Sequence, residues 1–132
     1  MPLVYVDANV LIAATRGMEP RAQRAFALLD NVSLRFAASD FLRLEVLPKA
    51  IYHRKSSEVT FYRDFFANAG VWAITEPRLV QTAMDLAQRF GLSAMDALHV
   101  AAAMSVHADV FVTDEASTKP IHRVTTLSIS KL

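Results

Sequence analysis

The sequence contains no cysteine among its 132 residues. This absence excludes a disulfide framework, a thiolate nucleophile and a zinc site with cysteine ligands. Disulfides mark oxidising compartments, so their exclusion favours a cytoplasmic location.

Long hydrophobic runs are also missing. No apolar run reaches the roughly 18 residues that a membrane-spanning helix needs, and the amino-terminal segment lacks the basic region and long apolar stretch of a signal peptide. Hydrophobic residues nevertheless make up 53% of the chain, and there is no low-complexity tract. A chain of this length is expected to form one domain, residues 1–132, with one well-filled core.

Neither sign of charge dominates. Lys and Arg number 14 against 13 Asp and Glu, so the net charge is only +1. A general electrostatic attraction to nucleic acid is therefore not expected, and any such binding must use a local patch. Residues 43–63 offer one, although a solvated helix face explains its basic side chains equally well. These side chains are Arg43, Lys49, His53, Arg54, Lys55 and Arg63.

The chain alternates between two kinds of segment. Short apolar runs rich in β-forming residues predict buried strands at 3–6, 34–38, 71–74 and 110–112, and an edge strand at 123–127. Helical spacing predicts helices at 8–14, after Pro20, after Ser39 or Asp40, and at 59–69, 78–90 and 93–107. This alternation predicts an α/β fold, in which a parallel sheet is covered on both faces.

Pro48 leaves the third predicted helix open to two interpretations. The proline either kinks the helix or ends it soon after Glu45, which would then lie only one turn into a shorter helix.

Acidic residues from separate segments are predicted to meet at one edge of the sheet. Asp7 follows the first strand, and Asp114 and Glu115 follow the fourth. Glu45 lies early in the helix after the second strand, and Asp96 lies in the first turn of the helix that leads into the fourth. In open α/β sheets, ligands bind at the carboxyl ends of the strands. Both helices begin at that edge, so these acids should share it.

The surroundings of these acids suggest a divalent cation. Helix 93–107 is apolar nearly all round, Asp96 is its only acid, and residues 92–108 contain no Lys or Arg. Clustered carboxylates in an apolar setting are costly without a positive partner. Mg²⁺ and Mn²⁺ prefer oxygen ligands. One ion can activate a water and a second can stabilise the leaving oxygen, which suits phosphodiester hydrolysis. The sequence leaves open whether one ion or two bind.

Each acid also has a purely structural explanation. Asp7 can cap helix 8–14, Asp96 can stabilise the start of a helix three residues after Ser93, and Glu45 can face water. The convergence of the acids favours a functional site.

Three neighbouring polar residues extend the predicted site. Asn9 either orients a carboxylate or a metal-bound water, or caps a turn; its amide also disfavours an aspartyl-phosphate phosphatase, which needs a second Asp there. Thr113 either hydrogen-bonds an acid or makes a local bond at the strand end. His99 lies one turn after Asp96, where a hydrogen-bonded core histidine is favoured over a metal ligand or general base.

The segments that carry these acids resemble the motifs of PIN-domain nucleases, and within that family the VapC-type toxins of toxin–antitoxin pairs. The similar segments are residues 4–12 (Val-Tyr-Val-Asp-Ala-Asn-Val-Leu-Ile), 39–47, 93–101 (Ser-Ala-Met-Asp-Ala-Leu-His-Val-Ala) and 109–115. The fourth departs from the pattern. The family's acid usually lies two residues after the threonine, which indicates Glu115, whereas the usual residue type slightly favours Asp114.

The resemblance implies a three-layer α/β/α sandwich with a short parallel central sheet. It implies Mg²⁺- or Mn²⁺-dependent cleavage of RNA, which leaves a 5′-phosphate and a 3′-hydroxyl. It also implies a homodimer and a cognate antitoxin protein. The implied catalytic set is Asp7, Glu45, Asp96, Asp114 and Glu115, all but Glu115 as metal ligands, with Asn9 and Thr113 in support. An inactive PIN-like binding module and an RNA-processing nuclease without an antitoxin remain alternatives.

Overall fold

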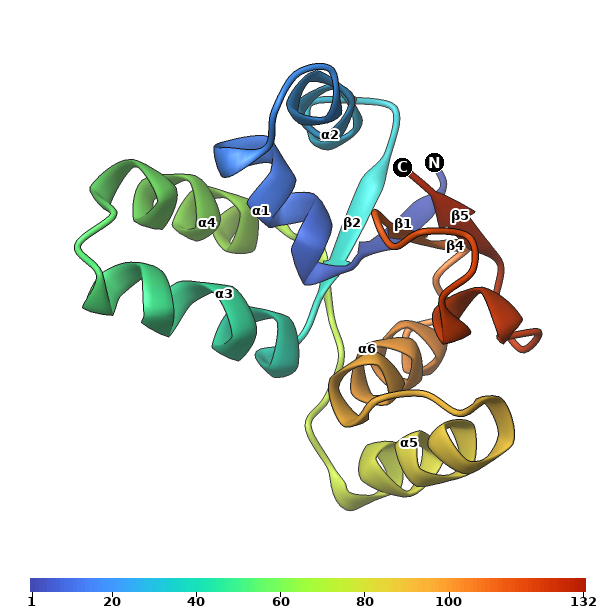
Figure 1. Cartoon of the computed structure of the whole chain (residues 1–132). Coiled ribbons are helices and arrows are strands. Elements are labelled where there is room, and N and C mark those ends of the chain that lie inside the picture. The colour runs from blue at the N-terminus through green and yellow to red at the C-terminus, as the bar shows by residue number, and fades with distance from the viewer.

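A parallel five-stranded sheet forms the centre of the molecule in the computed structural model, which describes residues 1–132 (Figure 1). Its strand order is β3-β2-β1-β4-β5, so the first strand lies in the middle. The strands are β1 (Leu3–Val6), β2 (Arg35–Ala38), β3 (Val71–Trp72), β4 (Val110–Thr113) and β5 (Ile129–Lys131).

Helices cover both faces of the sheet, with α1 to α4 on one side and α5 and α6 on the other (Figure 1). They are α1 (Ala8–Arg16), α2 (Arg21–Leu29), α3 (Asp40–Tyr52), α4 (Ser56–Asn68), α5 (Pro77–Phe90) and α6 (Ala94–Ser105), followed by a short 3₁₀ helix, Pro120–Arg123. The predicted three-layer α/β/α architecture is confirmed.

The central strand shows how the two layers are held. Successive side chains of a strand point to opposite faces. Leu3 and Tyr5 therefore belong to the core under α5 and α6, whereas Val4 and Val6 belong to the core under α1, α3 and α4. All four residues of β1 are buried. This accounts for an apolar run without the polar alternation of a half-exposed strand.

Local signals fix most helix ends near their predicted positions. Ser39 and Ser93 cap α3 and α6 by accepting hydrogen bonds from backbone N–H groups. Gly91 ends α5 with φ +69, a left-handed conformation that favours glycine. α3 continues through Pro48 to Tyr52, so the interpretation of a shorter helix was wrong. α4 begins at Ser56, three residues before the predicted start at residue 59, and its first turn is polar.

The prediction of an edge strand at 123–127 was wrong, because the fifth strand is β5 at Ile129–Lys131. Val124 is buried in the core under α5 and α6, next to the end of the 3₁₀ helix. The apolar residues of this segment therefore serve packing, and pairing with β4 is made by 129–131 instead.

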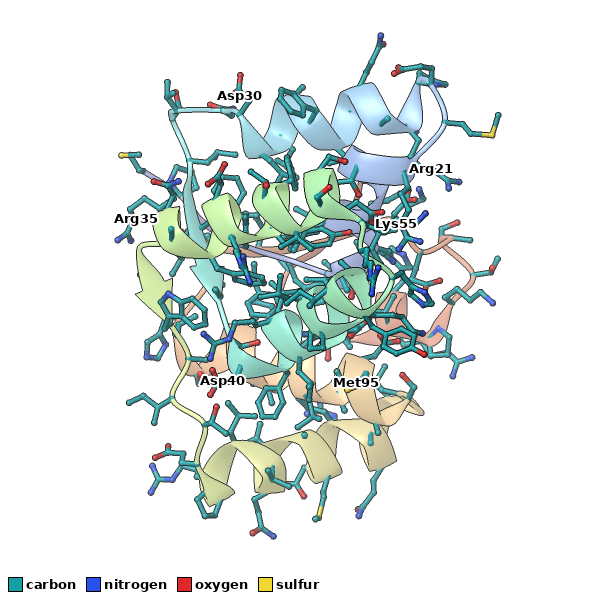
Figure 2. The ribbon with its side chains drawn as sticks, turned by 90° about the vertical axis from the view of Figure 1, so that its left-hand side faces the viewer. Arg21, Asp30, Arg35, Asp40, Lys55 and Met95 are labelled. Atoms are coloured by element: carbon teal, nitrogen blue, oxygen red, sulfur yellow. The ribbon has the colours of Figure 1, made fainter.

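The helical layer that carries the predicted basic patch faces the viewer in Figure 2. There α3 and α4 lie antiparallel in front, joined by the turn that contains Lys55. None of the helices combines the length and apolar character needed to cross a membrane.

Candidate acidic site at the carboxyl edge of the sheet

Asp7 lies where β1 ends and α1 begins. Its Oδ1 accepts a hydrogen bond from the backbone N–H of Ala8 at 2.8 Å, and its Oδ2 accepts one from the Thr113 hydroxyl at 3.1 Å. The residue is the N-cap of α1 and only 5% exposed. The capping and site roles expected from the sequence therefore coexist in one side chain.

Thr113 and Asn9 tie the end of β4 to the start of α1. The Asn9 amide donates to Thr113 Oγ1 at 3.3 Å, and Asn9 Oδ1 accepts the backbone N–H of Asp114 at 2.9 Å. Thr113 Oγ1 also accepts the backbone N–H of Glu115 at 3.1 Å. These bonds fix the segment that follows β4 relative to Asp7. Thr113 and Asn9 therefore position Asp7 and the backbone of residues 114 and 115.

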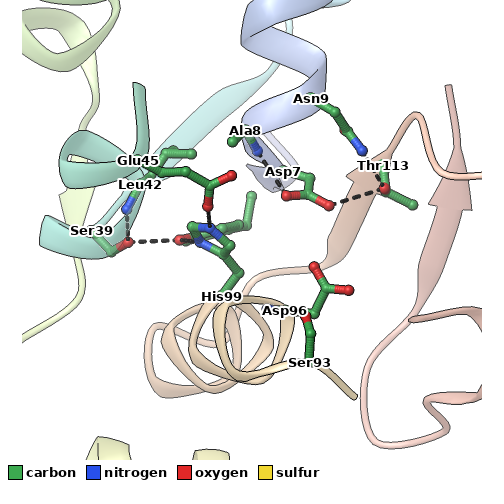
Figure 3. Close-up of polar contacts among 11 residues, drawn as sticks. Asp7, Ala8, Asn9, Ser39, Leu42, Glu45, Ser93, Asp96, His99 and Thr113 are labelled. Carbon is green, nitrogen blue, oxygen red and sulfur yellow. Dashed lines mark hydrogen bonds and ion pairs between the residues drawn. The ribbon is translucent and has the colours of Figure 1, made fainter. Parts of the chain in front are cut away.

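Asp96 reaches the same space from the other side of the site. It lies in the first turn of α6, where its backbone N–H donates to Ser93 Oγ at 3.3 Å. Figure 3 shows its carboxylate directed toward that of Asp7. The side chain is half-buried. The structure thus brings together acids from two segments far apart in the sequence.

The electrostatics of this pair are unfavourable without a cation. Burial is the main cause that raises the pKa of Asp7 to about 6; the charge of Asp96 also raises this pKa, and the interaction with His99 lowers it. Burial, followed by the charge of Glu115, raises the pKa of Asp96. No Lys or Arg forms an ion pair with Asp7, Asp96 or Glu115. The site therefore concentrates negative charge that no Lys or Arg neutralises and that His99 offsets only in part.

Glu45 projects from the second turn of α3 toward α6. Its Oε1 lies 2.7 Å from His99 Nε2, and 35% of its side chain is exposed. Its charge is among the causes that raise the pKa of Asp96. The charges of Glu45 and Asp96 therefore interact, and a histidine holds the Glu45 carboxylate.

The two adjacent acids after β4 have different surroundings. Asp114 Oδ2 lies 3.0 Å from Arg21 Nε, and its Oδ1 lies 3.1 Å from Lys131 Nζ, so both carboxylate oxygens are taken by cations. Glu115, in contrast, acts on Asp96 through its charge, and His122 Nε2 contacts its backbone carbonyl at 3.0 Å. Two cations therefore neutralise Asp114, whereas Glu115 has no such partner.

The donor set fits a divalent cation by its chemistry. Carboxylate oxygens are the ligands that Mg²⁺ and Mn²⁺ prefer, and the unneutralised charge of Asp7 and Asp96 supplies the attraction. No three acidic or imidazole side chains are closed around a common point that would hold an ion. The residues present therefore fit a divalent cation in type and charge. Their carboxylates, however, do not converge closely enough to form a complete set of ligands.

A cleft of about 410 Å³ opens beside Glu45. Most of its other polar lining is basic and comes from α1, α3 and the turn before α4. Its polar lining residues are Arg16, Glu45, Lys49, His53, Lys55 and Glu58. Three members of the predicted basic patch thus gather next to the acidic site, whereas Arg43 pairs with Asp40 at 2.9 Å.

Sequence reasoning missed the contacts beneath Glu45. His99 was expected to be a hydrogen-bonded core residue, and it is fully buried. Its partners are Glu45 on one side and Tyr5 on the other. The Tyr5 hydroxyl in turn contacts Ser39 Oγ at 2.6 Å. The only signal in the sequence was position, because Tyr5, Ser39 and His99 each lie within six residues of one of the predicted site acids.

Comparison with known proteins agrees with the fold. The family model described as PIN domain matches residues 4–120. No curated protein sequence matches the chain. Among solved structures, a chain of VapBC2 from Rickettsia felis, bound to a promoter DNA fragment, has a TM-score of 0.72 at 14% identity and covers 98% of both chains. A chain of DNA-bound VapBC from Salmonella typhimurium has a TM-score of 0.65 at 19% identity, covering 99% of this chain and 98% of its own.

Proposed function

Because this chain belongs to the PIN-domain family, we propose that it is a single-domain, metal-dependent endoribonuclease. One observation carries the proposal. The carboxylates of Asp7 and Asp96 face one another at the carboxyl edge of the sheet, and neither forms an ion pair with a Lys or Arg. A site of this kind attracts a dication.

Asp7, Glu45, Asp96 and Glu115 are the residues that would hold Mg²⁺ or Mn²⁺. Such an ion, when bound, lowers the pKa of a coordinated water and offsets phosphate charge. The protein's own part is orientation. Thr113 fixes one oxygen of Asp7, and Asn9 fixes the backbone ahead of Glu115. Asp114 instead stabilises the fold through Arg21 and Lys131.

The basic cleft beside Glu45 supports RNA as the substrate. Lys49, His53 and Lys55 line it and form none of the ion pairs of the structure. Positive side chains next to an acidic metal site are suited to the phosphates that flank the scissile bond. We therefore place the RNA backbone along this cleft, with the scissile phosphate over the acids.

We further propose that the protein is the toxin of a toxin–antitoxin pair, acts in the cytoplasm as a homodimer and is inhibited by a cognate antitoxin. The support is the likeness of the fold to chains of VapBC complexes. A test is whether the product of a neighbouring gene binds the protein and suppresses its activity. Cleavage without such a partner would favour a nuclease of RNA processing.

The decisive experiment is cleavage of single-stranded RNA in the presence of Mn²⁺ or Mg²⁺. We expect Asp7→Asn and Asp96→Asn to lower the rate by about a thousandfold, because each removes charge that holds the metal. Products should carry a 5′-phosphate and a 3′-hydroxyl. The matched control is Asp114→Asn, which removes a carboxylate from the same edge and should retain activity within about threefold, as for a group outside the reacting shell.

Glu115→Gln separates the two adjacent acids in the same assay. We expect it to lower the rate about ten- to a hundredfold, as loss of a weaker ligand or an outer-shell group does. Equal loss in Asp114→Asn would contradict the assignment of the fourth acid. Full activity in Asp7→Asn and Asp96→Asn would overturn the nuclease proposal, and a wild type that binds Mn²⁺ but cuts no RNA would favour a binding module.

A further inference from the structure

A continuous hydrogen-bonded chain runs beneath Glu45. Glu45 Oε1 lies 2.7 Å from His99 Nε2, His99 Nδ1 lies 2.8 Å from the Tyr5 hydroxyl, and that hydroxyl lies 2.6 Å from Ser39 Oγ. Ser39 Oγ accepts the backbone N–H of Leu42 at 3.1 Å. Tyr5, Ser39 and His99 are all fully buried, so water cannot replace any of these partners.

The two ends of the chain determine its direction. The Leu42 N–H can only donate, and an ionised Glu45 carboxylate can only accept. If His99 carries its proton on Nε2, every step is satisfied: Ser39 donates to Tyr5, Tyr5 donates to Nδ1, and Nε2–H donates to Glu45. A proton on Nδ1 alone would instead leave two acceptors, Nε2 and the carboxylate, facing one another at 2.7 Å. Of the two neutral tautomers, the geometry thus favours the one that carries its proton on Nε2.

The chain also joins the three segments that deliver the first three acids. Tyr5 lies two residues before Asp7 on β1, Ser39 caps the helix that carries Glu45, and His99 lies one turn after Asp96 on α6. A shift of α3 relative to α6 would break the contact between Glu45 and His99. The spacing of the acids is therefore coupled to buried contacts that do not themselves face the site.

We propose that His99, oriented by Tyr5 and Ser39, is a positioning residue that holds the Glu45 carboxylate for the metal. This inference rests on the proposed function. Oε1 is occupied by His99, and Oε2 has no hydrogen-bond partner within the protein, so it is the oxygen left for a cation. Metal-binding carboxylates are commonly oriented by such outer hydrogen bonds, whose loss weakens metal affinity.

The test is Mn²⁺ binding to the folded protein, measured by calorimetry without RNA. We expect Tyr5→Phe, which deletes one buried hydroxyl, to weaken binding several-fold, and His99→Leu to weaken it about ten- to a hundredfold. His99→Gln should restore part of the loss, because its amide can still donate to Glu45. The matched control is Tyr62→Phe, another buried tyrosine, whose hydroxyl bonds Glu58 at 3.2 Å; it should bind Mn²⁺ as the wild type does.

A second readout needs no metal. The ¹⁵N shifts of the His99 ring should report a proton on Nε2 in the wild type, and the Tyr5→Phe variant should change them. Wild-type affinity in both Tyr5→Phe and His99→Leu, an equal loss in Tyr62→Phe, or a proton on Nδ1 would each overturn the inference while leaving the nuclease proposal intact. Failure of the wild type to bind Mn²⁺ would overturn both.

Discussion

Two groups of buried or half-buried carboxylates in this molecule differ in what surrounds them. Glu58 is 8% exposed and lies 3.0 Å from Arg16, and Asp114 has Arg21 and Lys131 within about the same distance. Asp7 is 5% exposed, and neither it nor Asp96 has a Lys or Arg partner. Acids that link one element of the fold to another, such as Glu58 and Asp114, are thus paired with Arg or Lys side chains. The fold leaves the acids between β1 and α6 without such a partner, and this difference is why we propose a binding site there.

The largest expected difference between the two groups is their response to Mn²⁺. A ligand at about a hundredfold over its Kd adds about 2.7 kcal/mol to the unfolding free energy, which for a chain of this size raises Tm by about 10 °C. We expect this rise in wild type and Asp114→Asn, and none in Asp7→Asn or Asp96→Asn. Thermal unfolding with and without the metal measures it. A similar rise in all four proteins would remove the distinction between the groups.

A somewhat smaller effect is expected from pH in the absence of metal. The pKa of Asp7 is raised from 3.8 to about 6 in the folded protein, so the native state holds this proton more tightly than the unfolded state. Stability from this group is therefore present below about pH 4 and is lost as pH rises through 6. Relative to Asp7→Asn, the wild type should lose on the order of 2 kcal/mol across this window.

Urea unfolding in a chelating buffer would measure this difference, since the carboxylates that do not interact with Asp7 titrate alike in both proteins and cancel. Added Mn²⁺ should abolish the difference near neutral pH. A constant difference between wild type and Asp7→Asn over the whole window would show that Asp7 is as well compensated as Glu58.

The smallest effect concerns the compensated group itself. Asp114→Asn removes the carboxylate that holds Arg21 and Lys131, and we expect it to lower the unfolding free energy by about 1 kcal/mol, because both cations are largely exposed. Asp96→Asn in metal-free buffer should cost nothing or stabilise, because it relieves repulsion. Equal losses in the two variants would mean that Asp96 has an unrecognised favourable partner.

Short apolar runs and helix caps were enough to predict the sheet and most of its helices. The meeting of Asp7 and Asp96 was also predictable, because the carboxyl ends of parallel strands and the starts of the intervening helices share one edge. The position of the edge strand could not be predicted, because an apolar residue such as Val124 is equally compatible with a strand and with a buried turn. The choice between Asp114 and Glu115 depended on Arg21 and Lys131, which lie far from them in sequence and approach only in the folded chain.

The double use of Asp7 determines which replacement can be interpreted. Asparagine is as good a helix cap as aspartate, so Asp7→Asn changes the charge and keeps α1 anchored at its first turn. Alanine would remove both at once, at a cost of about 1 kcal/mol to the helix end. An alanine scan would therefore report a frayed helix as lost chemistry at this position, and the amide is the substitution that keeps the two apart.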